Sequence, residues 1–160
     1  MLKNARKTKS VLSTSLIMLS FALGSILIMA VFMGIPFIFK NSKDIDTLVF
    51  YIGMFIIGLN YLIMIVFLLD IVSTSRVNIF VKSNVKKFKN IGYLLLVNLI
   101  LDYILTIIDG VSGLRFLDLA PGVFITSGMA IYFIAGLLCF VIADAFNQAI
   151  AIKEENEFTV

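Results

Sequence analysis

Long stretches without any charged residue constrain this chain more than any other feature. Residues 10–39, 47–69 and 119–143 contain no Asp, Glu, Lys or Arg. A helix needs about 20 residues to cross a hydrocarbon layer of roughly 30 Å, and each stretch is long enough. These stretches predict three transmembrane helices. Because 61% of the 160 residues are hydrophobic and only 14% are charged, a water-soluble domain is excluded.

A fourth span is predicted over residues 91–111, although this stretch contains Asp102 and Asp109. A carboxylate at the centre of a membrane helix raises the free energy of insertion by roughly 2.5 to 3.5 kcal/mol. Each Leu, Ile or Val lowers it by about 0.3 to 0.6 kcal/mol. The stretch holds enough aliphatic residues to offset one central Asp. The chain is therefore predicted to be an all-α membrane protein with four transmembrane helices, at about 11–37, 47–69, 91–111 and 119–143.

The distribution of basic residues predicts the orientation. Ten of the thirteen Lys and Arg residues lie before the first span, between the second and third, or after the fourth. Under the positive-inside rule, both termini and the middle loop are expected in the cytoplasm. The net charge of +3 then reflects orientation in a membrane, and no direct binding of nucleic acid is expected.

The middle loop has a helical pattern of its own at about 79–90. Its apolar positions recur at helical spacing, and Asn78 is a suitable N-cap. This pattern predicts an amphipathic helix in the cytoplasmic membrane interface, which then turns into the third span. After the fourth span, residues 144–160 contain good helix formers, so a helical cytoplasmic tail is expected. No internal repeat or linker divides the chain, and residues 1–160 are expected to form one domain.

Two cytoplasmic segments form a candidate surface for lipid or a partner protein. In the middle loop, the lysines suit anionic lipid headgroups, and the tail is acidic. Asp70, at the end of the second span, is expected to pair with a basic residue of this loop. The candidate residues are Phe80, Lys82, Asn84, Lys86, Lys87, Lys89, Glu154 and Glu155.

A second candidate site lies within the membrane. Asn98, Asp102 and Asp109 fall within about 40° of one another on a helix, and Asn60 lies at a similar depth in the second span. This polar seam has three interpretations that the sequence leaves open. The side chains hydrogen-bond to one another and fix the packing of the helices, or they carry protons or a cation, or they sense a ligand or partner.

The residue types present argue against an enzyme. The chain has no histidine, which removes the commonest general base and metal ligand. Its single cysteine, Cys139, lies within the fourth span and cannot form an intrachain disulfide. We expect no catalytic residue, no metal and no cofactor.

Two segments resemble a bacterial family catalogued as domain of unknown function 2975. One is Asn78-Ile-Phe-Val-Lys-Ser-Asn-Val-Lys-Lys-Phe-Lys-Asn-Ile-Gly92, similar to the family's Phe, Asn and basic pattern before a helix that begins at Gly. The other is the tail, which ends in Glu154-Glu-Asn-Glu-Phe-Thr-Val160 and is close to the family's acidic ending. Ile79 stands where members often have Pro, and Phe158 where they often have Leu.

The resemblance implies a multi-pass protein of the bacterial cytoplasmic membrane. Genes of such proteins often lie beside one for a small helix-turn-helix repressor, so the leading hypothesis is a regulatory or sensing partner of such a transcription regulator. The alternatives are a small proton or cation transporter or channel that uses Asp102, and a structural protein of the envelope stress response. The expected partners are the bilayer, the regulator and further copies of the chain in a homo-oligomer.

Overall fold

The computed structural model describes residues 2–40, 44–75, 79–109, 115–120 and 123–157. Four helices account for most of them, and each is long and apolar enough to cross a membrane, as the sequence predicted. Two short strands form an antiparallel hairpin between the third and fourth helices. The elements are α1 (Leu2–Lys40), α2 (Ile45–Thr74), α3 (Lys82–Asp109), β1 (Arg115–Ala120), β2 (Val123–Thr126) and α4 (Ser127–Glu157).

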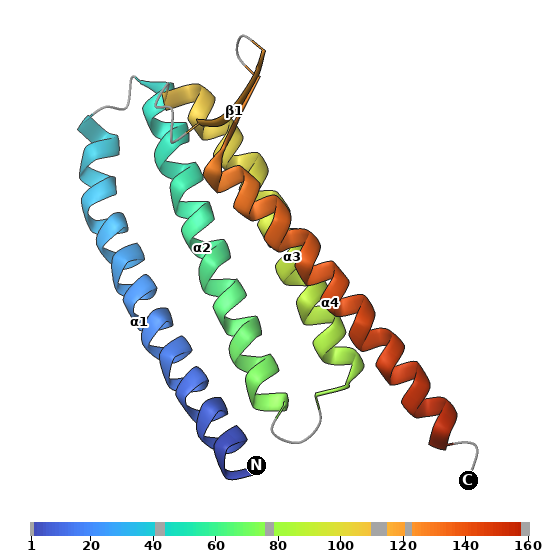
Figure 1. Ribbon diagram of the computed structural model, residues 1–160. Coiled ribbons are helices and arrows are strands. Elements are labelled where there is room, and N and C mark those ends of the chain that lie inside the picture. The colour runs from blue at the N-terminus through green and yellow to red at the C-terminus, as the bar shows by residue number, and fades with distance from the viewer. Residues whose placement is uncertain (1, 41–43, 76–78, 110–114, 121–122, 158–160) are drawn as a thin grey trace.

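The helices follow one another across the molecule, and α3 and α4 pack along one another (Figure 1). Helix α1 begins and α4 ends at the same end of the molecule, which we call the termini side. The hairpin marks the opposite end, the hairpin side. This arrangement follows from the number of helices, because a chain that forms four antiparallel spans ends on the side where it began.

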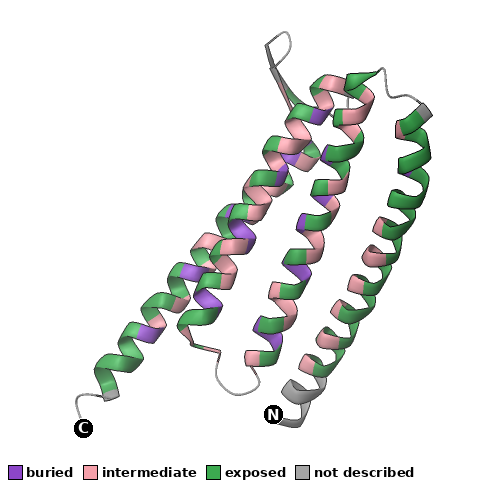
Figure 2. Ribbon diagram, turned by 180° about the vertical axis from the view of Figure 1, so that it is seen from behind, coloured by how far each residue is buried: buried purple, intermediate pink, exposed green. Residues whose placement is uncertain are grey.

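Helix α1 packs on α2 at the edge of the molecule. Leu27 would contact a Cβ atom at Gly58, and the rings of Phe37 and Tyr51 lie 5.0 Å apart. At the termini side, Lys9 Nζ donates to the carbonyl oxygen of Ser75, 2.6 Å away, at the C-cap of α2, where a positive charge is favoured by the helix dipole. Most of α1 is exposed in the protein alone, so its apolar surface is left to lipid (Figure 2).

Helices α3 and α4 approach each other closely at two glycines. A Cβ atom on Gly92 would lie 3.1 Å from the carbonyl oxygen of Gly136 and 3.0 Å from the ring of Phe140. Any side chain at Gly92 would therefore push against backbone. Small residues allow helices in membranes to approach in this way, since dispersion forces rather than the hydrophobic effect hold them together there.

Buried side chains lie on the mutually facing sides of α2, α3 and α4 (Figure 2). One cluster centres on Met64, Ile71 and Ile91, with the half-buried Leu95 and Cys139 packed against it. A second cluster, nearer the termini side, joins Val85 of α3 to Ala143 and Ile150 of α4. Helices α2, α3 and α4 therefore share one core, to which α1 is added from one side.

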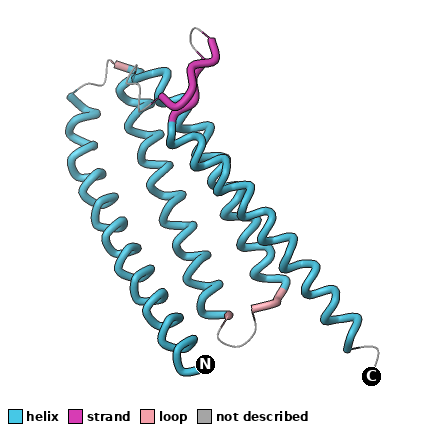
Figure 3. The backbone as a smooth tube through the Cα atoms, viewed as in Figure 1, coloured by secondary structure: helices cyan, strands magenta, loops and turns pink. Residues whose placement is uncertain are grey.

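The hairpin was not predicted, and it changes the start of the fourth helix. The fourth span was expected from residue 119, but α4 begins at Ser127, and residues 123–126 form β2, which pairs with β1 (Figure 3). Hydropathy detects apolar residues without distinguishing helix from strand. Pro121-Gly122 is a turn-forming dipeptide, and Val123-Phe-Ile-Thr126 is rich in β-branched and aromatic residues, which favour strands.

The structure also corrects the boundary of the predicted interfacial helix. A separate helix at about 79–90 was expected to turn into the third span, but α3 runs without a break from Lys82 to Asp109. No proline interrupts residues 82–109, and Gly92 is accommodated by its contact with α4, so the helix continues through the expected turn. At 1.5 Å per residue, these 28 residues extend for about 42 Å, which exceeds a hydrocarbon core of about 30 Å. Asn78, the expected N-cap, lies outside the described residues.

Candidate functional site

Two members of the predicted polar seam bind each other directly. Asn60 Nδ2 on α2 donates to Asn98 Oδ1 on α3, at 2.7 Å. The exposed fractions of the two residues are 8% and 0%. Asn98 Nδ2 is buried and has no hydrogen-bond partner in the part of the chain that the structure describes. A buried amide group without a partner costs about 1 to 3 kcal/mol, so this donor needs an explanation.

Asp102 lies beside the beginning of α4. Its Oδ2 accepts a hydrogen bond from Thr126 Oγ1 at 3.3 Å, and Thr126 Oγ1 in turn accepts one from the backbone N–H of Met129 at 3.2 Å. Thr126 is therefore the N-cap of α4. The positive end of the α4 dipole favours a carboxylate at this position. Asp102 thus links α3 to the first turn of α4 and lies in the last third of α3.

A pair of tyrosines, which the sequence reasoning missed, joins α2 to α4. Tyr61 Oη donates to Tyr132 Oη at 2.8 Å. Tyr61 follows Asn60 in the chain, so the two hydrogen-bonded pairs begin from neighbouring residues of α2. The sequence did contain a sign of this pair, because Tyr61 lies next to Asn60 within an apolar span. A buried tyrosine hydroxyl usually has a hydrogen-bond partner. Thr126 was also missed, and a threonine directly before an apolar helix is a recognisable N-cap.

The described polar side chains of the seam extend from the middle of α2 and α3 toward the hairpin side. Toward the termini side, the next turns of α2 and α3 supply Met64, Ile91 and Leu95, which belong to an apolar cluster. The seam therefore meets an apolar layer below Asn60 and Asn98. The side chain of Asp109, the fourth predicted member of the seam, lies outside the described residues.

At the termini side, aromatic rings join the start of α3 to the end of α4. Phe146 makes edge contacts with Phe80 and Phe88, with ring centroids 5.6 Å and 5.4 Å apart. Beside them, Lys82 Nζ and Glu154 Oε1 form an ion pair at 3.0 Å, with both side chains exposed. The two predicted cytoplasmic segments therefore pack against each other to form one surface, with Lys86 and Lys89 exposed on α3 and Glu155 exposed on α4.

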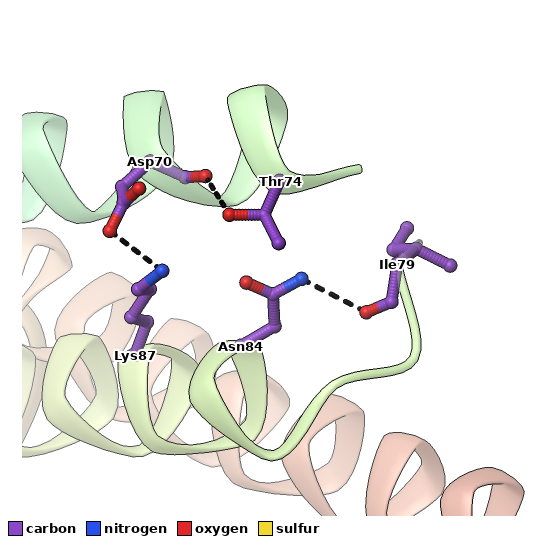
Figure 4. Close-up of polar contacts among 5 residues, drawn as sticks. All are labelled: Asp70, Thr74, Ile79, Asn84 and Lys87. Atoms are coloured by element: carbon purple, nitrogen blue, oxygen red, sulfur yellow. Dashed lines mark hydrogen bonds and ion pairs between the residues drawn. The ribbon is translucent and has the colours of Figure 1, made fainter. Parts of the chain in front are cut away.

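Asn84 does not belong to that surface, which corrects its assignment as a lipid or partner contact. It is 0% exposed, and its Nδ2 donates to the carbonyl oxygen of Ile79 at 2.9 Å (Figure 4). Its amide thus holds the segment that precedes α3, and it faces Thr74 of α2. Hydrophobic periodicity could not place Asn84, since a short amide side chain suits both a surface and a buried bond to backbone.

Lys87 is also turned toward α2. Its Nζ lies 2.6 Å from Asp70 Oδ2, and its side chain is only 14% exposed (Figure 4). Asp70 was predicted to pair with a basic residue of this segment, and Lys87 is the partner. Lys87 therefore takes part in the contact between α2 and α3. It is less accessible to lipid than Lys86 and Lys89.

No group of three or more His, Cys, Asp or Glu side chains able to hold a metal ion occurs among the described residues. The site chemistry consists of amides, hydroxyls and one carboxylate within the bundle, and of charged and aromatic groups at the termini side. Such groups can bind water, a small polar ligand or another protein.

Comparison with known protein families identifies one match. The family model described as "Protein of unknown function (DUF2975)" matches residues 40–160, which include α2, α3, the hairpin and α4. No curated protein and no solved structure matches the chain.

Proposed function

Because this chain belongs to the DUF2975 family of proteins of unknown function, we propose from its own surfaces that it is a regulatory partner in a bacterial cytoplasmic membrane. Its partner in this proposal is a small cytoplasmic helix-turn-helix transcription regulator. The termini side faces the cytoplasm, in agreement with the excess of Lys and Arg on that side. The first turns of α3 lie in the headgroup layer, where Lys86 and Lys89 contact anionic lipid.

The observation that carries this proposal is the ordered surface formed by the start of α3 and the end of α4. α4 has 31 residues and is about 46 Å long, so roughly ten of its residues extend beyond a hydrocarbon core of about 30 Å. Residues 151–156 are all exposed. The contacts of Phe146 with Phe80 and Phe88 hold this extension in place, and a surface fixed in advance loses little conformational entropy on binding.

Charge supports the choice of partner. The exposed end of α4 carries Glu155 and also Glu154, which is paired with Lys82 in an exposed ion pair. A DNA-binding domain presents basic side chains to DNA phosphates. An acidic helix complements such a basic surface and competes with DNA for it. Binding of the regulator at the membrane would then reduce its occupancy of DNA.

The arrangement of the seam favours a regulatory protein over a transporter that uses Asp102. A path for protons or cations needs polar groups or water through the full thickness of the membrane. The seam instead meets Met64 and Ile91, each 5% exposed, on its termini side. Purified protein in liposomes is expected to give no proton or cation flux, and flux that is abolished by Asp102→Asn would support the transporter instead.

Co-purification with the proposed helix-turn-helix regulator tests the proposal. We expect Glu154→Gln combined with Glu155→Gln to weaken capture of the regulator by at least about tenfold at low salt, because two charges of the acidic surface are removed. The matched control combines Lys86→Gln with Lys89→Gln, which removes two charges from the neighbouring lipid-facing surface and should leave capture unchanged.

Transcription from the promoter of the regulator provides the second measurement. The acidic double variant should change expression from this promoter as strongly as deletion of the membrane protein does. Equal capture and equal expression with wild type, the acidic double variant and a scrambled 147–160 segment would refute the proposal.

A further inference from the structure

One face of α3 carries exposed side chains from the first turn of the helix to the last. At about 100° per residue, eight of these positions fall within about 80° of one another around the helix axis. From the termini side to the hairpin side, they are Lys82, Lys86, Lys89, Tyr93, Val97, Ile100, Ile104 and Ile107. This face, which we call the α3 outer face, therefore changes from basic to aromatic to aliphatic along the helix.

The order of side chains on the α3 outer face matches the order of groups in a phospholipid. Lysine side chains attract anionic headgroups, and tyrosine is enriched at the boundary between headgroups and hydrocarbon. Aliphatic side chains contact acyl chains. Tyr93 follows Lys89 by about one helical turn, and Val97 follows Tyr93 by another. A lipid molecule that lies along α3 therefore meets a suitable side chain at each level.

Two lysines of the α3 outer face have charges that the described part of the chain does not neutralise. Lys86 and Lys89 are exposed, and neither forms an ion pair with another described residue. The other two lysines of this segment are each paired with an acidic side chain, and one of them, Lys87, is turned toward Asp70 on α2 (Figure 4). Residues three apart on a helix are neighbours, so one anionic headgroup can lie near both free lysines.

Tyr93 is held in position by α4. Its ring lies 5.0 Å from the ring of Phe140, with an angle of 67° between the two planes, and the residue is nevertheless 59% exposed. Gly92, the preceding residue, lies against Gly136 of α4, which brings the two helices together at this level. An exposed tyrosine hydroxyl near the lysines can donate a hydrogen bond to a phosphate or ester oxygen of a lipid.

We propose that the α3 outer face is a selective binding site for an anionic phospholipid. The headgroup lies against Lys86 and Lys89, Tyr93 lies beside the glycerol region, and the acyl chains follow Val97 and Ile100. This inference rests on the lipid contact proposed above for the two lysines, and it adds a defined site with a preference for headgroup charge. It does not depend on the transcription regulator, which is absent from the experiments below.

Quenching of a single tryptophan by brominated lipids tests the proposal. The chain contains no tryptophan, so Tyr93→Trp introduces one reporter, which keeps an aromatic ring and a hydrogen-bond donor. The full chain is reconstituted in vesicles of phosphatidylcholine and phosphatidylglycerol, and one lipid at a time is brominated on its acyl chains. We expect phosphatidylglycerol to be preferred at this reporter by at least about fivefold.

A second reporter distinguishes a selective site from general contact with lipid. Phe133→Trp places the tryptophan on α4 near the hairpin side, at a position that is 50% exposed. Its preference for phosphatidylglycerol should be less than about twofold, because no lysine belongs to the described part of α4 at that end. Equal preference at the two reporters would overturn the proposal.

Substitution of the two lysines gives the decisive variants in the Tyr93→Trp background. Lys86→Gln combined with Lys89→Gln should lower the preference to less than about twofold, because both free charges are removed. Lys86→Arg combined with Lys89→Arg is the matched control, which keeps both charges and should keep the preference. A preference that survives the glutamine substitutions would overturn the proposal, as would its loss in the arginine variant.

Inorganic phosphate distinguishes a phospholipid site from a site for a soluble anion. Replacement of chloride by phosphate at equal ionic strength should leave the preference for phosphatidylglycerol unchanged, because screening is the same and phosphate has no acyl chains to contact the aliphatic part of the face. Loss of the preference in phosphate would assign the two lysines to a soluble anion and overturn the phospholipid site.

Discussion

Helices α3 and α4 are joined by different chemistry at their two ends. At the hairpin side, Asp102 accepts from Thr126, and buried amides and hydroxyls fill the layer below. At the termini side, aromatic and aliphatic side chains pack together beside an exposed ion pair. In the membrane placement proposed above, this difference is explained by the solvent at each end. Lipid provides no hydrophobic driving force between helices, so close packing and hydrogen bonds hold them there, whereas water drives apolar packing wherever the helices leave the membrane.

The largest effect is expected between the two ends, at the glycine contact. Gly92→Leu would place a side chain against the carbonyl oxygen of Gly136, and backbone cannot move aside. We expect a loss of about 3 kcal/mol or more in the free energy of unfolding, or failure to fold, measured by unfolding in mixed detergent micelles. Gly24→Leu on α1 is the control, and equal stability of the two variants would refute close packing as the main contact.

The aromatic contacts at the termini side should produce the next largest effect. Phe146→Ala removes a half-buried ring that contacts Phe80 and Phe88, and we expect it to cost about 2 kcal/mol. Phe32→Ala on α1, where the ring is 75% exposed, should cost almost nothing. Similar losses for the two variants would show that the end of α4 is buried in lipid rather than surrounded by water.

The buried amides should contribute less than the aromatic rings. Asn98→Leu leaves Asn60 without its partner, and we expect a loss of about 1 kcal/mol. A double-mutant cycle with Asn60→Leu should give a coupling energy of about 0.6 kcal/mol, the typical value for such bonds in membranes. A coupling energy near zero would show that each amide prefers water to its partner.

The exposed ion pair between Lys82 and Glu154 should have the smallest effect. Lys82→Glu is expected to cost less than about 0.5 kcal/mol, and combination with Glu154→Lys should restore that loss. Thermal unfolding at low and high salt measures both, because salt screens exposed charges. A loss above 1 kcal/mol would mean that this pair is shielded from water.

The sequence predicted the number of helices because hydropathy is summed over about 20 residues, and single exceptions such as Asp102 do not change the sum. It also indicated that Asn60, Asn98 and Asp102 belong to one region, because helical spacing places Asn98 and Asp102 on one face. It did not predict the hairpin, since a strand of three apolar residues and a threonine before α4 resembles the first turn of the helix.

The roles of the polar residues could be decided only by the tertiary structure. Asn84 is buried and Lys86 is exposed although both lie in one amphipathic segment, because α2 covers only part of that segment. Asp102 lies beside the N-terminus of α4 because the hairpin shortens that helix and places Thr126 at its start. The sequence alone determined four apolar helices and the faces on which their polar groups lie. Which of those groups meet depended on where the chain reverses and on where glycine allows two helices to touch, and both depend on contacts between residues far apart in the sequence.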